Sequence, residues 1–280
     1  MPRPFWKGAI SFGMVSIPVK LYTATEEKDV HFNMLHAEDM SRIKQKRFCA
    51  EEDVEVSNDE IVKGYEITPG RYVTIDDEDF AKVPVSSSRQ IEIQEFVSLD
   101  QIDPIYYQKT YYLEPEEVGM KPFALLMKTL EETERVAIAK VAMRQKEQLC
   151  TLRIREGTIV LETMFYSDEV RSPKDLALPG DDVKVNDKEL AMAKMLVDTM
   201  TSDELDLSQY KDDYREALLE IIQAKSEGQV IQAPEPVTAK ITDLSEALRA
   251  SVEAIRRSKA AGDKLDAEPA AHRRTRAKAS

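Results

Sequence analysis

The segment Val15-Ser16-Ile17-Pro18-Val19-Lys20-Leu21-Tyr22 decides the fold class, because its apolar and polar side chains alternate. A period of two predicts a β-strand with one buried face. That face consists of Val15, Ile17, Val19 and Leu21. The shorter alternation of Ile10 and Phe12 predicts a preceding strand, with Gly13 at the bend between the two. Pro18 has no backbone N–H to donate, which predicts an edge or irregular position in the sheet.

Strand signals continue through the first two thirds of the chain. Further strands are expected at 30–36, 71–75, 89–97, 106–113, 136–143, 151–155 and 158–166. The last two flank Gly157 and predict a hairpin. Short helical turns are expected at 58–62 and from Asp76, and the spacing of Phe123, Leu126 and Leu130 predicts an amphipathic helix.

The period changes to that of helices from Asn186 onwards. Two helices are expected, one through Leu190 and Val197 and one through Tyr214 and Ile222. A proline-containing linker at 229–239 then leads to an amphipathic helix at 243–259 and a basic tail at 272–278. We therefore divide the chain into residues 1–185, residues 186–228 and residues 229–280.

Composition bounds the class of protein. The 280 residues are 42% hydrophobic and 32% charged, which is typical of a globular protein with a highly charged surface. No apolar run is long enough to span a membrane, so no membrane partner is expected. The two cysteines, Cys49 and Cys150, lie far apart in sequence and predict reduced thiols in a cytoplasmic protein.

The net charge of −13 opposes nucleic-acid binding only if the charge is evenly spread. The stretch Ser41-Arg42-Ile43-Lys44-Gln45-Lys46-Arg47 has four cations and no acid, whereas acids follow at once in residues 51–55. Such segregation fits a basic inner surface with an acidic exterior. The alternatives are an ordinary charge-mixed surface, or an acidic scaffold that binds proteins and never touches DNA.

Three blocks of sequence resemble the prokaryotic Ku family. They are residues 6–22, residues 59–66, and residues 102–107 with 111–115, and the likeness runs from Trp6 to about Lys225. The resemblance implies an α+β, β-rich fold, with a Ku-type β-barrel core, an arch around DNA and a C-terminal α-helical arm. It also implies a homodimeric ring that threads onto ends of double-stranded DNA in non-homologous end joining. An ATP-dependent DNA ligase D is the implied partner of the C-terminal region.

Basic side chains on predicted sheet edges and loops are the candidates for DNA contact, because phosphate contacts give affinity without sequence information. The candidates are Lys20, Arg42, Lys44, Lys46, Arg47, Lys109, Arg144 and Lys146. The run from Arg42 to Arg47 is the first choice for the lining of the arch. Arg153 and Arg155 are weaker choices, because arginines on the outer face of a hairpin are often simply solvated.

Catalytic and metal-binding patterns are sparse. The sequence has no phosphate-binding loop, dinucleotide fingerprint or nucleophile elbow, so we expect neither an enzyme nor a cofactor. Asp76-Asp77-Glu78-Asp79 could belong to a metal-dependent hydrolase, but a solvated helix start explains these acids without any ion. Cys49 has no second cysteine nearby and cannot fill a tetrahedral zinc site by itself.

Overall fold

A computed structural model describes residues 3–83, 89–143, 146–180, 183–228 and 248–257. The chain forms two compact units, Met1–Lys174 and Asp175–Ser280. The division of the chain at residues 185 and 228 that the sequence suggests stays a prediction.

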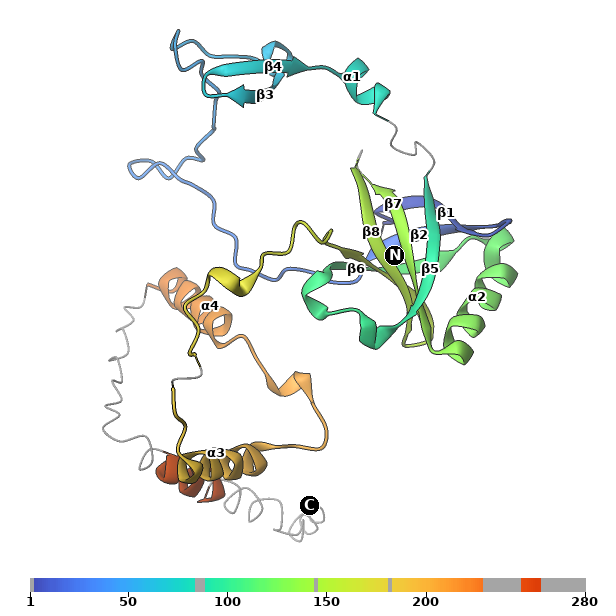
Figure 1. Cartoon of the computed structure of the whole chain (residues 1–280). Helices are drawn as coiled ribbons and strands as arrows, with labels where there is room; N and C mark the ends of the chain where they lie inside the picture. The colour runs from blue at the N-terminus through green and yellow to red at the C-terminus, as the bar shows by residue number, and fades with distance from the viewer. Residues whose placement is uncertain (1–2, 84–88, 144–145, 181–182, 229–247, 258–280) are drawn as a thin grey trace, which may run out of the picture. The chain divides into compact units, whose positions relative to one another are not determined.

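A closed seven-stranded β-barrel dominates the first unit (Figure 1). Around the barrel the strand order is β1-β2-β6-β9-β8-β7-β5. The strands are β1 (Trp6–Phe12), β2 (Val15–Thr23), β5 (Gln90–Ser98), β6 (Tyr107–Pro115), β7 (Arg135–Met143), β8 (Lys146–Arg155) and β9 (Thr158–Met164). The barrel confirms the predicted α+β, β-rich fold class.

The barrel closes where β1 and β5 meet as parallel neighbours, with Ile10 opposite Ile91. The other strand pairs of the barrel are antiparallel. Gly8 permits this approach, since a Cβ there would lie 2.1 Å from the carbonyl oxygen of Arg89. The amide of Ala9 donates to that same oxygen at 2.9 Å. Glycine is thus required at the closing seam.

The alternation in β2 predicts the core correctly except at its first residue. Ile17, Val19 and Leu21 are completely buried, whereas Val15 is 43% exposed. Val15 lies at the tip of the β1–β2 hairpin, beside Gly13 with a φ of +59°, so nothing covers it.

Of the two positions predicted for Pro18, a sheet edge is wrong for the strand as a whole, because β2 lies between β1 and β6 in the closed barrel. An irregular position is what the pairing shows. Pairing between β2 and β6 ends at Val19, opposite Pro115. Pro18 therefore lies just beyond the end of β6, where no ladder donor is needed. Its carbonyl oxygen instead accepts from the amide of Glu116 at 2.9 Å.

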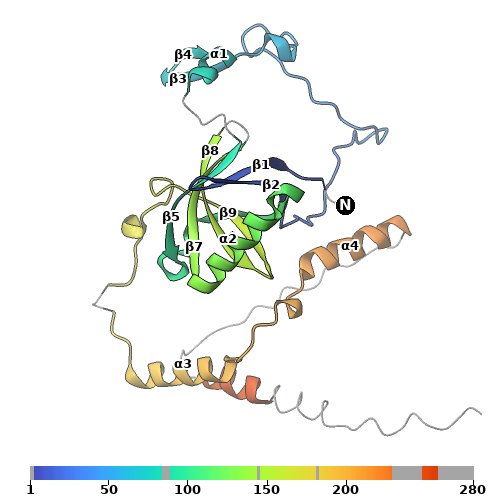
Figure 2. The same ribbon diagram turned by 90° about the vertical axis from the view of Figure 1, so that its right-hand side faces the viewer.

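Helix α2 (Met120–Thr133) packs against the barrel and extends its core (Figure 2). Phe123, Leu126 and Leu130 are buried on one face, as their spacing predicts. The β8–β9 hairpin also follows the prediction. Its two turn residues, Glu156 and Gly157, both have positive φ, which matches the twist of the flanking strands.

Residues 24–89 form a long insertion between β2 and β5. It contains η1 (Asn58–Glu60), β3 (Lys63–Thr68), β4 (Arg71–Ile75) and α1 (Asp77–Lys82). β3 and β4 form a separate two-stranded sheet. The strand expected at 30–36 is wrong: only an isolated bridge between Leu35 and Arg42 forms there. Its apolar residues alternate, but no neighbouring strand offers a continuous ladder.

The second unit is helical, as the change of period predicts. It contains α3 (Asp187–Met200), α4 (Asp213–Ser226) and a helical segment at 248–257, which Figures 1 and 2 show in red beside α3. Neither α3 nor α4 has a buried residue. The expected linker at 229–239 and tail at 272–278 lie outside the described residues. Short 3-10 turns are η2 (Leu99–Gln101), η3 (Pro104–Tyr106), η4 (Glu117–Gly119), η5 (Pro173–Asp175) and η6 (Leu207–Gln209).

Candidate nucleic-acid interface

The basic run of the insertion connects two turns with the same hydrogen-bond pattern. In the first turn, the amide of His36 donates to Ser41 O at 2.8 Å, and the amide of Met40 donates back to His36 O at 2.9 Å. Both turns include a residue other than glycine with positive φ, Met40 at 57° and Asp53 at 52°. This repeat gives residues 42–47 a defined backbone on both sides.

The second turn repeats these bonds. The amide of Cys49 donates to Val54 O at 2.9 Å, and the amide of Asp53 donates to Cys49 O at 3.0 Å. The backbone of the run is tied to both turns, because Ile43 donates to Met34 O and Val56 donates to Arg47 O. These local hydrogen bonds therefore position the backbone of the run.

The four cations of the run are exposed, but they differ in how far their charge is satisfied. Lys46 Nζ lies 2.6 Å from Glu55 Oε2, in an ion pair that the bridge between Phe48 and Glu55 holds in register. Arg47 Nη1 donates to Asn58 Oδ1. Within the part of the chain that the structure describes, Arg42 and Lys44 have no ion pair and are the cations most available to a phosphate.

The candidates on the barrel are less available. Lys20 Nζ lies 3.6 Å from Glu114, and a hydrogen bond from Tyr22 lowers the pKa of that carboxyl below its ordinary value. Lys146 Nζ lies 3.7 Å from Glu169. Arg144 lies outside the described residues. Two of these three candidates therefore already have a carboxylate partner.

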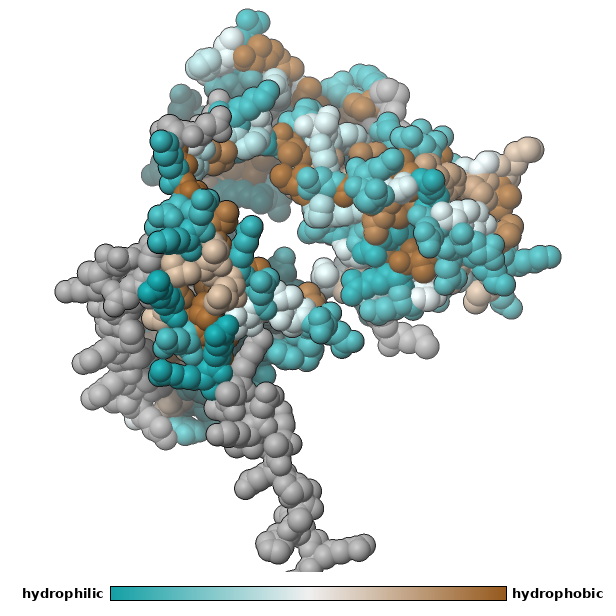
Figure 3. All heavy atoms as spheres, turned by 60° about the horizontal axis from the view of Figure 1, so that its bottom comes forward, coloured by the Kyte–Doolittle hydropathy of each residue, from teal (hydrophilic) through white to brown (hydrophobic). Residues whose placement is uncertain are grey.

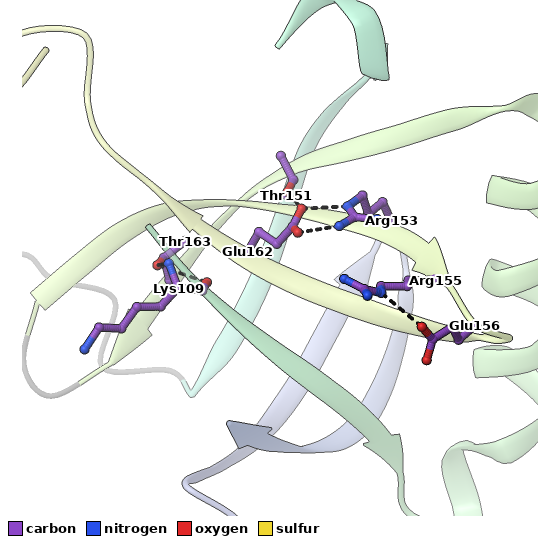
Figure 4. Close-up of polar contacts among 7 residues, drawn as sticks. All are labelled: Lys109, Thr151, Arg153, Arg155, Glu156, Glu162 and Thr163. Carbon is purple, nitrogen blue, oxygen red and sulfur yellow. Dashed lines mark hydrogen bonds and ion pairs between the residues drawn. The ribbon is translucent and has the colours of Figure 1, made fainter. Parts of the chain in front are cut away.

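Lys109 is the exception among the barrel candidates. Its backbone amide donates to Thr163 Oγ1 at 3.2 Å, which fixes β6 against β9. Its ammonium group extends away from these strands in Figure 4, and within the described residues it makes no ion pair. Lys109 thus joins Arg42 and Lys44 as an exposed, unsatisfied cation.

Arg153 is not simply solvated, contrary to the expectation for an arginine on the outer face of the hairpin. Its guanidinium binds Glu162 through two hydrogen bonds of 2.7 and 2.5 Å (Figure 4). The side chain of Glu162 is only 9% exposed and that of Arg153 24%. Because of this neutralisation, Arg153 has little charge to offer to DNA. Arg155 likewise lies 3.4 Å from Glu156.

The acids at Asp76–Asp79 start α1, as a solvated helix start requires. Asp76 accepts a hydrogen bond from the amide of Asp79, and the Asp79 carboxylate lies 2.9 Å from Lys82. The hydrogen bond from Lys82, and a second one from the backbone amide of Asp76, hold the pKa of the Asp79 carboxyl below its ordinary value. Among the described residues, no group of three or more histidine, cysteine or acidic side chains could hold a metal ion.

Fold and charge together define a class of protein: a β-barrel whose long insertion presents exposed cations to solvent. Residues 11–192 match the sequence family described as "Ku70/Ku80 beta-barrel domain". The match covers more than half of the chain, so the chain belongs to the Ku family. Searched over the described residues, no helix is both long and apolar enough to cross a bilayer.

Proteins named "Non-homologous end joining protein Ku" align along most of the chain. The one from Heliobacterium modesticaldum is 43% identical over 274 residues, covering 97% of this chain and 98% of that protein. The one from Archaeoglobus fulgidus is 44% identical over 254 residues, covering 91% of this chain and all of that protein.

A longer relative from Frankia casuarinae is 48% identical over 256 residues, or 91% of this chain. The chain spans 64% of the length of that protein and 65% of the length of a Symbiobacterium thermophilum relative.

Proposed function

We propose that this chain binds ends of double-stranded DNA, independently of sequence, in non-homologous end joining. The observation that carries the proposal is the acid-free run of Arg42, Lys44, Lys46 and Arg47, which is exposed on the insertion. Cations on a backbone fixed by local hydrogen bonds suit phosphates, which are the same in every sequence. A break can occur anywhere, so an end binder needs this kind of contact.

The proposed assembly is a homodimeric ring in which residues 1–185 form the core and its insertion forms the bridge around DNA. Exposed apolar side chains support a second copy as the partner (Figure 3). They include Val62, Tyr65, Ile67 and Tyr72 on the insertion and Leu190, Val197 and Tyr214 on the helical unit. Exposed apolar side chains such as these are candidates for an interface where they lie together on one face. In the proposed assembly, residues 186–228 pack on the core or on the partner copy.

A closed ring selects ends by topology, because it can load only where the duplex terminates. Equivalent phosphate contacts at each step then allow it to slide inwards. We propose no catalytic step and no cofactor. The surplus acids lie on the outside of the proposed ring, where they do not repel the duplex. The proposed location is the cytoplasm, in association with the nucleoid.

A comparison of linear and covalently closed circular duplex of the same sequence tests the ring. We expect tight binding to the linear duplex and very weak binding to the circle in a gel-shift assay. Nicking the circle without opening both strands is a matched control, which should not restore binding. Equal affinity for the linear and closed forms would remove the ring mechanism.

Charge reversal of Arg42, Lys44, Lys46 and Arg47 to Glu tests the DNA-binding surface. Binding to all sequences should weaken alike, and the log–log salt slope should flatten by about 0.9 for each lost phosphate contact. Arg42→Glu with Lys44→Glu should account for most of the loss, because Lys46 and Arg47 already have partners. The control Lys121→Glu with Lys128→Glu, on the exposed face of α2, should leave the slope unchanged.

The C-terminal region, residues 229–280, is the proposed contact with an ATP-dependent DNA ligase D. Deletion from Gln229 should leave end binding intact and reduce stimulation of the ligase. If stimulation survives the deletion, the docking surface lies on the core instead.

A second candidate function is an acidic scaffold that binds proteins without DNA, which the net charge of −13 favours. A filter-binding assay at moderate salt separates the two. Retention of linear duplex supports end binding, and its absence at every protein concentration supports the scaffold.

A further inference from the structure

An open cavity of about 1190 Å³ lies at one end of the barrel. It is formed where β5 ends at Ser98, α2 ends at Thr133 and β7 begins at Arg135. The insertion joins the opposite end of β5, at Gln90, and none of the described residues that line the cavity comes from it. The cavity therefore belongs to the barrel and is separate from the basic run.

The wall of the cavity is largely apolar. Leu130 and Val136 are buried in it, with exposed fractions of 2% and 4%, and Ile102 and Ile154 are half-buried. Leu99 also lines the cavity but is 49% exposed, so part of the apolar wall is uncovered among the described residues. Such a wall suits a side chain with an aliphatic stem more than a hydrated ion.

The charge of the lining is negative overall. Arg153 is already neutralised, because it binds Glu162 through two hydrogen bonds (Figure 4). The other guanidinium group, that of Arg135, donates to Ser98 Oγ at 2.5 Å. The remaining carboxylates of the lining are exposed and make no ion pair among the described residues. They are Asp100, Glu131 and Glu134.

The end of α2 breaks two local rules at this cavity. A helix C-terminus carries partial negative charge and favours cations, yet the last turn of α2 contains Glu131 and Glu132 and no basic residue. The C-cap, Glu134, has a φ of 52°, a conformation that normally selects glycine. Natural proteins break such rules mainly at functional sites, so this end of the helix is suited to a positively charged ligand.

We propose that this cavity binds an arginine-containing segment of a partner protein. Arginine combines the two required features, because its aliphatic stem covers apolar surface while its guanidinium binds carboxylates in a fork geometry. Charge complementarity selects a basic partner, since the three carboxylates without an ion pair have no other cation within the described lining except Arg135. DNA does not fit this site, because the same carboxylates repel phosphates.

The size of the cavity favours a peptide segment over a small molecule. Small-molecule sites usually measure about 300–1,000 Å³ and enclose most of their ligand. This cavity is larger and open. Its acids come from two elements, Asp100 from η2 and Glu131 and Glu134 from the end of α2, so it can engage more than one cationic side chain. The proposal does not depend on DNA binding by the insertion, and either can fail without the other.

Fluorescence anisotropy with the full chain and a labelled peptide tests the proposal. The probe is a short peptide in which arginine alternates with leucine, and binding is measured at physiological salt. Glu131→Lys should weaken binding of the probe by at least about tenfold, the size expected for one lost charge-assisted hydrogen bond. Two further peptides separate charge from apolar contact: citrulline replaces arginine in one, and serine replaces leucine in the other. Both should bind more weakly than the probe.

Glu132→Lys is the matched control, because Glu132 lies in the same helical turn but does not line the cavity. Both substitutions remove an acid from a helix C-terminus and should raise the midpoint of thermal unfolding, which shows that the variants fold. Glu132→Lys should weaken binding by less than about threefold, since salt screens exposed charges that do not contact the probe.

Photo-crosslinking locates the bound peptide. A version of the probe that contains p-benzoylphenylalanine should crosslink to peptides that contain residues 98–104 and 130–136, as mapped by mass spectrometry. Crosslinks confined to other parts of the chain would overturn the proposal. So would equal losses of affinity in the Glu131 and Glu132 variants, equal binding of the serine-containing peptide, or the absence of saturable binding.

Discussion

The barrel and the insertion of the first unit are held together in different ways. In the barrel, seven strands and α2 bury a continuous core, and closure leaves no free sheet edge. In the insertion, none of the described residues 24–83 is buried. Turns, a capped helix and a two-stranded sheet hold it by local hydrogen bonds.

This difference separates stability from binding. Burial of apolar area is the dominant favourable term in folding, so the barrel provides most of the stability of its unit. An isolated two-stranded hairpin is marginal in water, which makes the insertion dependent on a partner or ligand for rigidity. The four cations of the run from Arg42 to Arg47 therefore lie on the less stable region.

The two cysteines, one in each region, give the largest expected contrast. Backbone N–H groups of Glu52 and Glu51 lower the pKa of Cys49, which favours its thiolate. Burial raises the pKa of Cys150. Iodoacetamide should alkylate Cys49 at least roughly 10³ times faster than Cys150 in the folded protein, because Cys150 reacts only after the barrel opens.

The pH dependence of the alkylation rate tests whether the lowered pKa of Cys49 causes its fast reaction. Since the pKa of Cys49 is lowered, its rate should rise with pH and level off at a lower pH than that of free cysteine. Peptide mass spectrometry over time measures both sites, and Cys49→Ser isolates Cys150. Comparable rates at the two sites would show that the barrel opens as readily as the insertion.

Truncation of one isoleucine in each region gives the next contrast, a difference of about 2–5 kcal/mol in the free energy of unfolding. Ile17 in β2 is completely buried, whereas Ile67 in β3 is 56% exposed. Trp6, the only tryptophan, reports on the barrel alone, because its Nε1 donates to Ala142 O at 3.1 Å. Ile17→Ala should lower the denaturant midpoint strongly.

Ile67→Ala should leave the barrel transition nearly unchanged at low protein concentration. If Ile67→Ala lowers the denaturant midpoint only at high protein concentration, Ile67 contributes to the proposed dimer. A loss equal to that of Ile17→Ala in dilute protein would contradict the division between the two regions.

Ion pairs extend the comparison with a smaller effect. Glu162→Gln removes the carboxylate from a half-buried Arg153, and we expect a cost of about 1–3 kcal/mol, less than for a fully buried pair. Glu55→Gln breaks an exposed pair with Lys46 and should cost at most about 1 kcal/mol.

The second variant should also strengthen DNA binding, because it frees Lys46 for a phosphate. Unfolding followed by Trp6 fluorescence and a salt titration of DNA affinity measure the two effects. If Glu55→Gln weakens DNA binding, the carboxylate positions the run instead of competing with phosphate.

The same contrast explains what the sequence could predict. Strands of the barrel are readable because a buried face imposes alternation, as Ile17, Val19 and Leu21 do. Val30, Phe32 and Met34 alternate equally well, yet form no strand, since alternation is only a necessary condition for pairing. The register that brings a neighbour depends on residues far away in the chain.

The sequence also could not predict which cations of the candidate site already have an acidic partner. Glu55 lies nine residues from Lys46, and the turn at residues 49–54 with its bridge at Phe48 brings the two together. Arg153 pairs across strands with Val160, which makes Glu162 its diagonal neighbour. A signal existed there, because Glu162 interrupts a mostly apolar strand and a buried acid requires a partner.

Glycine turns give the smallest contrast and the most specific one. Gly13 at the β1–β2 turn and Gly70 at the β3–β4 turn have φ of +59° and +80°, and a Cβ at either would meet open space. Alanine therefore costs only backbone strain, about 1–2 kcal/mol. Gly13→Ala should lower the barrel transition by about this amount, because hairpin and barrel unfold together. Gly70→Ala should only speed amide exchange in residues 63–75.

Gly13→Asn is the control, since asparagine tolerates left-handed backbone better than alanine does. If alanine and asparagine at residue 13 lower the stability of the barrel equally, the positive φ is not what makes glycine favourable at this turn.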